Sequence, residues 1–299
     1  MLENPAAKKR LLVLASTFPR WKDDTEPRFV LDLSNELANT FDVTVLAPFS
    51  PGSAVSEQLE DVQVSRFKYA FFDSWSVLTA PGSILGNLKR RPWLAVLLPF
   101  FFLGQVLAMR RAIVRGNFDA IHVHWIVPQA FSFWAASWFV NPPPFIVTAH
   151  GGDASITSLR FIRQLAHLAI KQASEVTVVA RHLQSKVPEA THVLPMGVDQ
   201  ERFTAISGEG APRVFFIGRL AKKKGVDVLL KATEGFDAEL PIHIVGGGEE
   251  RDALEKLGSH SIFHGPLSHN EIVSVLNKSD LICLPFKAGG ALDSDGTPT

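Results

Sequence analysis

The sequence predicts an α/β protein with two domains, each built on a doubly wound parallel sheet. The chain has 299 residues, which suits about two domains at roughly 100–200 residues each. Hydrophobic residues make up 46% of the chain and charged residues 20%, the proportions of an ordinary globular protein. Short, almost continuously apolar runs alternate with longer segments of helical periodicity, a pattern typical of parallel strands covered by helices on both faces.

The first domain is predicted over residues 1–205. Its expected strands are residues 10–15, 42–47, 62–68, 120–124, 145–150, 175–179 and 192–195. Between the first two strands, Phe29, Leu33 and Leu37 recur at every fourth position, which predicts a helix with an apolar stripe. Pro27 stands where the first turn of that helix tolerates a proline.

The second domain is predicted over residues 212–299. Residues 203–212 are rich in Ser, Gly and Pro and have no apolar periodicity, which indicates a linker. Beyond it the alternation resumes, with strands expected at residues 213–217, 242–245, 261–263 and 280–284 and helices near residues 225–235, 249–257 and 269–278.

Charge and cysteine content restrict the partners and the compartment. Thirty Lys and Arg balance thirty Asp and Glu, so no overall field holds a polyanion, and nucleic acid is not expected as a partner. The single cysteine, Cys283, cannot form an intrachain disulfide, which fits a reducing compartment. The basic residues 8–10 precede only a short apolar run without a cleavage site, so no signal peptide is expected. The cytoplasm is the predicted location.

Residues 92–109 are predominantly apolar and have basic flanks at residues 89–91 and 110–111. A core helix is the preferred interpretation. A spanning helix needs about 20 apolar residues, and Pro99, Gly104 and Gln105 interrupt this segment. The main alternative is an amphipathic element on the cytoplasmic face of a membrane, with its basic flanks near lipid phosphates.

Two basic side chains follow the first predicted strand of the second domain. Ligands of open α/β sheets bind outside the carboxyl ends of the strands, where Gly218, Arg219 and Lys224 are expected. Arginine binds phosphate oxygens in bidentate fashion and lysine acts as a point charge, so the pair predicts a diphosphate site. A solvated loop formed by residues 222–224 is the alternative.

Histidines gather at the ends of two predicted strands of the first domain. His150 precedes two glycines, which suits a ligand-facing position because glycine allows close approach to the backbone; a buried core histidine is the alternative. On the strand 120–124, alternation places His122 and His124 on one face and Trp125 on the other. The acceptor side of a cleft and the core both fit these residues. Two histidines without a third ligand make a poor zinc site, so no metal is expected.

Residues 246–248 are three glycines between a predicted strand and a predicted helix. The dinucleotide spacing G-x-G-x-x-G is not met, because Glu250 and Arg251 occupy the required positions, and this disfavours a dehydrogenase. A tight turn, with Glu249 and Glu250 at a helix N-terminus, is the structural alternative.

Taken in order, several motifs make nearly the whole chain resemble the family-four retaining glycosyltransferases, which have the glycosyltransferase-B fold. The motifs are Ile121-His122-Val123-His124-Trp125, Val147-Thr148-Ala149-His150-Gly151-Gly152-Asp153, Pro195-Met196-Gly197-Val198-Asp199 with Phe203, the segment 215–225, Val245-Gly246-Gly247-Gly248-Glu249-Glu250 and Phe263-His264-Gly265-Pro266-Leu267. The resemblance implies two Rossmann-like domains facing a cleft. It also implies retaining transfer of a sugar from a nucleoside-diphosphate sugar to a hydroxyl acceptor, a saccharide or a lipid-linked one, in polysaccharide or glycolipid synthesis.

The resemblance also implies roles for individual residues. Catalysis falls to His150, Arg219 and Lys224. The donor is expected to contact Gly218, Arg219, Lys224, Gly248, Glu249, Leu267, Asp295, Gly296 and Thr297, and the acceptor side is expected to include His122, His124, Trp125 and Asp153. No metal or cofactor is implied.

The sequence departs from the family pattern in two places. Asp295 stands where the family has the first of two glutamates eight positions apart, and the second position lies beyond Thr299. An incomplete second domain and poor activity are therefore expected. Near the first strand, where many members have glycines, the chain has Thr17-Phe18-Pro19-Arg20, so Arg20 or Arg28 is expected to contact the anion instead.

Two other functions remain open at this point. A sugar-nucleotide epimerase of the same fold would also bind a nucleoside diphosphate, and an inactive nucleotide-sugar-binding fragment would need no second carboxylate. The residues do not identify the donor base, the sugar or the acceptor.

Overall fold

The computed structural model describes residues 7–152, 160–199, 201, 213–235, 242–258 and 261–287. The chain forms two compact units. Among the described residues, unit 1 contains residues 7–22 and 26–198, and unit 2 contains residues 23–25 and those from 199 to 287. The predicted linker, residues 203–212, lies outside the described residues.

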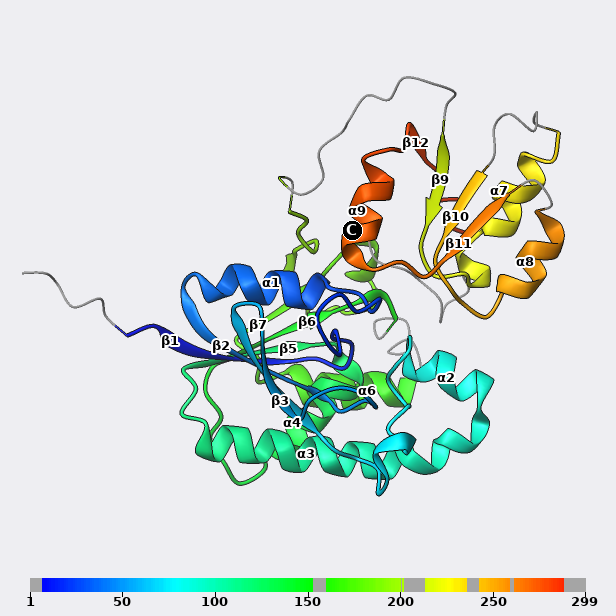
Figure 1. Ribbon diagram of the computed structural model, residues 1–299. Coiled ribbons are helices and arrows are strands. Elements are labelled where there is room, and N and C mark those ends of the chain that lie inside the picture. The colour runs from blue at the N-terminus through cyan, green and yellow to red at the C-terminus, as the bar shows by residue number, and fades with distance from the viewer. Residues whose placement is uncertain are drawn as a thin grey trace, which may run out of the picture. The chain divides into compact units, whose positions relative to one another are not determined.

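Unit 1 is built on an eight-stranded sheet with the order β3-β4-β2-β1-β5-β6-β7-β8 (Figure 1). The strands are β1 (Lys9–Leu14), β2 (Phe41–Pro48), β3 (Ser56–Leu59), β4 (Val62–Phe67), β5 (Ala120–His124), β6 (Phe145–Ala149), β7 (Glu175–Val178) and β8 (His192–Val193). All seven predicted strands are present, each within two residues of its expected ends, and all pair in parallel. Strand β3 was not predicted. It is antiparallel to β4, and Leu59 alone among its residues is buried, so it lacks an apolar run.

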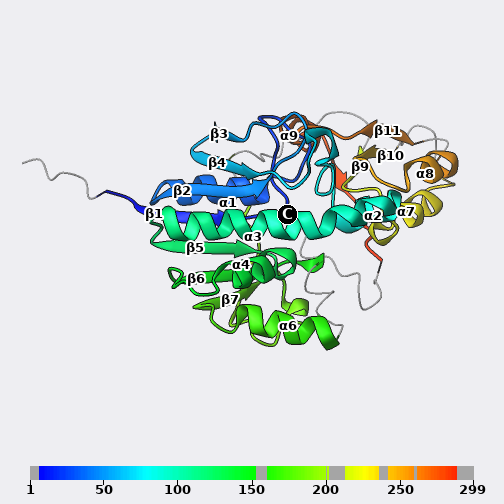
Figure 2. The ribbon, with the colours of Figure 1, turned by 90° about the horizontal axis from the view of Figure 1, so that it is seen from below.

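Helices cover both faces of this sheet. Helix α1 (Phe29–Ala38) lies on one face, and α3 (Leu98–Arg115), α4 (Phe131–Ala136) and α6 (Arg160–Ile170) lie on the other (Figures 1 and 2). In β1, Leu11 and Val13 point into the core under α1, while Leu12 and Leu14 point into the core under α3, α4 and α6. The strand is therefore buried on both sides, as its continuous hydrophobicity predicts. The short helix α2 (Ile84–Arg90) precedes α3.

The buried face of α1 differs from the predicted stripe. The helix begins at Phe29 with Arg28 as its N-cap, so Pro27 lies before the helix. Its buried residues are Val30, Leu31 and Ser34, whereas Leu33 is only half-buried. Positions four apart drift by about 40° at each step around an α-helix, so the predicted stripe runs along the edge of the core-facing side, where Phe29 and Leu37 pack against the core.

Unit 2 is a four-stranded parallel sheet with the order β11-β10-β9-β12. The strands are β9 (Val214–Ile217), β10 (Ile242–Val245), β11 (Ile262–Gly265) and β12 (Leu281–Ile282), and the helices are α7 (Val226–Ala232), α8 (Arg251–Leu257) and α9 (His269–Leu276). Its core joins strand residues such as Phe216 and Ile244 to Leu229, Leu230 and Leu254 from the helices. Every predicted strand and helix of this part is present.

The apolar segment 92–109 forms a 3-10 turn, Pro92–Leu97, and most of α3. The whole stretch Pro92–Arg115 is long and apolar enough to cross a membrane by length and composition. Its mean hydropathy is 1.8 over 18 residues, and only 28% of that apolar part is buried in the structure. One side of α3 carries the buried Phe101, Gln105 and Met109. The prediction of a core helix therefore holds for one face only.

Candidate functional site

The carboxyl end of β9 is the point where the chain order of the unit 2 sheet reverses. From β9 the chain moves to β10 on one side, and β12 returns to pair on the other side. Such switch points are where open α/β sheets bind ligands. Gly218 and Arg219 follow β9 directly, and Lys224 ends the 3-10 turn Lys222–Lys224 that leads into α7. The predicted diphosphate residues thus lie at this end of the sheet.

Arg219 and Lys224 each contact a neighbouring side chain. The Nε and Nη2 atoms of Arg219 donate to Oε2 of Glu249 at 3.2 and 3.0 Å. Both side chains are about one third exposed, at 30% and 37%. The ammonium of Lys224 lies 4.1 Å from the centre of the Phe286 ring, a cation–π distance. An anion that binds Arg219 would therefore meet the carboxylate of Glu249 beside it.

The glycines after β10 let two loops lie backbone against backbone. Leu220 N donates to Gly247 O at 2.9 Å, and Glu250 N donates to Leu220 O at 3.0 Å. A Cβ atom at Gly246 would lie 1.9 Å from the Gly218 carbonyl oxygen, and one at Gly248 would lie 2.3 Å from that of Leu220. Side chains at either position would push the loops apart, so these glycines hold Gly248 and Glu249 beside the loop of Arg219.

Leu267 lies at the end of the third neighbouring strand, β11. It is half-buried and precedes Ser268, the N-cap of α9. Ser268 and Glu271 form a capping box, in which Ser268 N donates to Glu271 Oε2 at 2.7 Å. The predicted donor residues among the described ones therefore occupy the carboxyl-end loops of three adjacent parallel strands.

In unit 1 the chain order reverses between β1 and β5, and the predicted histidines stand on β5 and just after β6. His122 Nε2 and Thr148 Oγ1 are 2.8 Å apart, and Thr148 Oγ1 lies 2.8 Å from Thr177 Oγ1. His124 Nδ1 lies 3.2 Å from His150 Nε2. Three imidazoles and two hydroxyls thus form paired hydrogen bonds across β5, β6 and β7.

The prediction that Trp125 faces away from the two histidines is wrong. Trp125 has φ 70°, which ends the alternation of β5 after His124. Its ring lies 4.5 Å from that of His150 and 6.0 Å from that of His124, measured between centroids. The left-handed backbone therefore turns Trp125 to the same side as the imidazoles, where Phe29 also packs at 5.4 Å from His150.

The three histidines are neutral at neutral pH. Burial lowers the pKa of His122 to about 4. Burial, with a smaller electrostatic contribution from His122 when both imidazoles are protonated, lowers the pKa of His150 to about 3. Burial, with smaller contributions from His122 and His150, also lowers the pKa of His124 well below its ordinary value. Among the described residues, His124 Nε2 is buried without a hydrogen-bond partner. These side chains can donate and accept hydrogen bonds but do not supply charge.

Sequence reasoning missed Thr148, Thr177 and Phe29 as members of this cluster. Thr148 could have been found from alternation, because Thr148 and His150 share a face along β6 as His122 and His124 share a face of β5. Thr177 stands on β7, and its place beside Thr148 depends on the register of the two strands. The position of Phe29 depends on how α1 packs, which its own sequence does not determine.

Comparison with known proteins decides the family. Residues 27–202 match Glycosyltransferase Family 4, and residues 198–292 match Glycosyl transferases group 1. The chain belongs to glycosyltransferase family 4. The resemblance stated from the motifs is thereby confirmed.

Similar proteins include other glycosyltransferases. The chain is 28% identical to a phosphatidyl-myo-inositol mannosyltransferase of Mycobacterium leprae, over 60% of this chain and 52% of that protein. It is 25% identical to the putative teichuronic acid biosynthesis glycosyltransferase TuaC of Bacillus subtilis, over 60% of this chain and 49% of that protein. The chain thus spans about half the length of these relatives.

Solved structures share the fold. Sucrose-phosphate synthase from Thermosynechococcus elongatus superposes with a TM-score of 0.67 at 13% identity, over 93% of this chain and 76% of that one. The Anabaena protein HepE in complex with UDP gives 0.61 at 15% identity, over 93% and 74%. The predicted fold class, two Rossmann-like units of the glycosyltransferase-B type, is confirmed.

Arg20 and Arg28, which were expected to contact the anion near the first strand, contact other side chains in this structure. Arg28 is buried and its Nη2 lies 2.9 Å from Asp32 and 2.8 Å from Glu60, so two carboxylates already balance its charge. The contact of Arg28 with an anion stays a prediction. The guanidinium of Arg20 lies 4.3 Å from the centre of the Trp21 ring.

Several predicted residues lie outside the described part of the chain: Asp153, Asp295, Gly296 and Thr297. Within the described part, no group of three or more His, Cys, Asp or Glu side chains could hold a metal ion.

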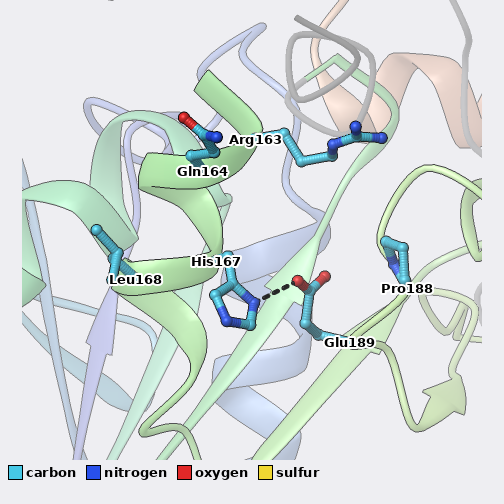
Figure 3. Close-up of a pocket in the computed structure, with 6 residues that line it drawn as sticks. All are labelled: Arg163, Gln164, His167, Leu168, Pro188 and Glu189. Atoms are coloured by element: carbon cyan, nitrogen blue, oxygen red, sulfur yellow. Dashed lines mark hydrogen bonds and ion pairs between the residues drawn. The ribbon is translucent and has the colours of Figure 1, made fainter. Parts of the chain in front are cut away.

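One open hollow of about 600 Å³ lies beside α6 (Figure 3). Its lining comes from one face of the helix and from Pro188 and Glu189, and His167 Nδ1 lies 2.8 Å from Glu189 Oε1. None of the predicted site residues lines this hollow, and the hydrogen-bonded pair of His167 and Glu189 lies at the surface, so we assign no function to it.

Proposed function

We propose that the protein transfers a sugar from a nucleoside-diphosphate sugar to a hydroxyl acceptor, with retention, in polysaccharide or glycolipid synthesis. The observation that carries the proposal is the position of Arg219 and Lys224 at the carboxyl end of β9, where the sheet order of unit 2 reverses. Membership of glycosyltransferase family 4 supports the reaction class. The solved complex of HepE with UDP supports a uridine diphosphate donor as the first one to test.

In the proposed reaction, the two cations bind the diphosphate and stabilise it as the leaving group. Negative charge grows on the departing nucleoside diphosphate as the bond to the sugar breaks, and fixed cations lower the energy of that state. Gly218 and Gly248 keep the surrounding backbone free of side chains, and Glu249 and Leu267 complete the donor side. The chemistry relies on protein cations rather than on a bound metal ion.

His150 is proposed to contact the transferred sugar, with His122, His124 and Trp125 on the acceptor side. Because burial keeps His150 neutral, its role would be hydrogen bonding to a sugar hydroxyl rather than charge stabilisation. The histidine pair on β5 would hold His150 in one orientation through the 3.2 Å contact of His124 Nδ1.

Substitution of Lys224 tests the donor assignment. Lys224→Ala should weaken UDP binding by about tenfold to a hundredfold, because one charge-assisted bond to phosphate is lost. Turnover of a UDP-sugar donor should fall by orders of magnitude. Titration calorimetry and release of UDP in the presence of an acceptor panel measure the two effects.

Lys222→Ala is the matched control, because Lys222 is an exposed neighbour in the same turn. It should leave UDP binding within about twofold, since surface charges off the site contribute little. If Lys224→Ala kept near-normal UDP affinity and turnover at an unchanged melting temperature, the assignment of Lys224 to the diphosphate site would be wrong. Conversion of the donor without any acceptor would indicate an epimerase instead.

A further inference from the structure

One face of the Pro92–Arg115 stretch is apolar and exposed. Val96, Phe100 and Leu103 are 69%, 58% and 57% exposed. Together with Trp93, Leu107 and Val114, each more than half exposed, they recur at intervals of three, four or seven residues. This spacing puts all six on one side of a helix. We call these six residues the α3 stripe.

The opposite side of α3 fixes the helix to unit 1. Phe101 and Met109 are fully buried, and Ser132 Oγ donates to Gln105 Oε1 at 2.6 Å. Gly104 allows the helix to approach the strand β4 side closely, since a Cβ there would lie 2.8 Å from the Lys68 carbonyl oxygen. If the segment spanned a membrane, Phe101 and Met109 would have to leave the core. The stripe must therefore find an apolar partner while α3 stays packed on unit 1.

Exposed aromatic residues border both ends of α3. Phe71, Phe72 and Trp75 form a ring cluster with centroid distances of 5.0 and 5.1 Å, just after Tyr69, which packs 5.1 Å from Phe101. At the other end, Arg110 Nη1 donates to Trp138 O at 2.7 Å, and the adjacent Phe139 is 98% exposed. Such rings favour the boundary between lipid and water.

The chain segment that carries the stripe is strongly basic. Asp119 is the only carboxylate between Asp73 and Asp153 in the sequence, and it accepts a hydrogen bond from Arg10 N at 2.7 Å. The same interval contains six cations, Lys89, Arg90, Arg91, Arg110, Arg111 and Arg115. The chain as a whole is neutral, so this concentration of positive charge is local.

Five of these cations face solvent. Lys89, Arg90, Arg91, Arg111 and Arg115 are exposed and form no ion pair with any other residue that the structure describes. Arg90 donates instead to Asn87 Oδ1 and to the Pro81 carbonyl oxygen. Arg111 lies on the stripe side of α3, four positions after Leu107. An acidic protein surface would satisfy the charges but not six large apolar side chains, whereas a bilayer with anionic headgroups satisfies both.

We propose that the α3 stripe docks on an anionic lipid bilayer. The stripe and the bordering aromatic rings enter the boundary between headgroups and acyl chains, and Lys89, Arg91, Arg111 and Arg115 lie among the lipid phosphates. The helix stays packed on unit 1, so the protein lies on the membrane rather than across it. This proposal goes beyond the proposed reaction and does not depend on it.

Co-sedimentation with vesicles tests it. The wild-type chain should bind vesicles in which about one lipid in three is phosphatidylglycerol, and the rest phosphatidylcholine, far better than vesicles of pure phosphatidylcholine. Phe100→Ser with Leu103→Ser and Leu107→Ser should reduce binding to the anionic vesicles at least about tenfold, because the buried apolar surface is lost. Arg91→Gln with Arg111→Gln and Arg115→Gln should reduce it by about fivefold per cation and remove the preference for anionic lipid.

Phe161→Ser with Val228→Ser and Leu257→Ser is the matched control, since these exposed apolar residues lie on other helices. It should bind vesicles as the wild type does. All three variants change exposed positions and should keep the wild-type melting temperature. Equal vesicle binding by the stripe variant and the wild type would overturn the proposal. The proposal would also be overturned if the wild type self-associated without lipid and the stripe variant did not. The stripe would then be an interface between copies of the chain.

Discussion

The Arg219–Glu249 pair joins two loops that are 30 residues apart in sequence. Because the carboxylate partly neutralises the guanidinium, Glu249→Gln should leave a hydrogen bond in place and make Arg219 a stronger phosphate ligand. A partly exposed pair of this kind is worth about 0–1 kcal/mol, so UDP binding should tighten by up to about fivefold. Titration calorimetry measures this, and Glu250→Gln on the neighbouring residue is the control. Weaker UDP binding would mean that Glu249 itself contacts the donor.

The buried imidazoles predict an acid-sensitive fold. The folded pKa values of His122 and His150 lie below the ordinary value of about 6.5, so the unfolded chain takes up protons first as the pH falls. The free energy of unfolding contributed by each neutral imidazole is fully present above about pH 7. It is lost as the pH falls from 6.5 to the folded pKa. At pH 5 the loss should be about 2 kcal/mol for each imidazole, measured by urea unfolding at pH 7.5 and pH 5.0.

His122→Val separates this effect from general acid destabilisation. The variant loses the bond to Thr148, so it should be less stable at pH 7.5, but the further loss at pH 5.0 should be smaller than in the wild type by about 2 kcal/mol. His182→Gln, at an exposed position, should follow the wild type. If His122→Val and the wild type lost the same stability on acidification, His122 would not be a buried neutral imidazole.

At the level of residues, sequence reasoning located the site positions better than their partners. Arg219 and Lys224 were expected after a strand and are found there, because a continuous apolar run defines where β9 ends. The pairing of Arg219 with Glu249 depends on the approach of two loops in space. The side of Trp125 depends on one left-handed φ angle that no periodicity records.

At the level of elements, the glycines after β10 are a packing requirement that can be tested. Gly246→Ala places a Cβ 1.9 Å from the Gly218 carbonyl oxygen, at φ 132°. The variant should destabilise unit 2 by about 3 kcal/mol, because neither loop can move without losing backbone hydrogen bonds. Gly235→Ala is the control, since a Cβ there meets nothing within 4 Å. Equal stability of the two variants in urea unfolding would show that the loops separate freely.

Most elements could be predicted because buried parallel strands have continuous apolar sequences, whereas edge elements do not. Strand β3 is polar and pairs through its backbone, so nothing in Ser56-Glu57-Gln58-Leu59 distinguishes it from a loop. Helix α3 could be recognised as a helix, but its apolar residues surround the axis. Composition therefore does not tell which side meets the core.

At the level of the whole molecule, the two units have separate cores and should unfold in two steps. The core of unit 2 is the smaller, so this unit should melt first, because less apolar surface is removed from water. All six tryptophans lie between residues 21 and 138, so tryptophan fluorescence follows unit 1 alone, while calorimetry follows both units. The fluorescence midpoint should then lie above the first calorimetric transition.

UDP connects this unfolding behaviour to the proposed function. A ligand held by Arg219 and Lys224 stabilises the unit that contains them, by about 2.7 kcal/mol at a hundred times its dissociation constant. UDP should therefore raise the first calorimetric transition by several degrees and leave the fluorescence midpoint unchanged. Lys224→Ala should abolish the shift and Lys222→Ala should preserve it. A shift confined to the fluorescence midpoint would move the donor site to unit 1 and contradict the assignment of the two cations.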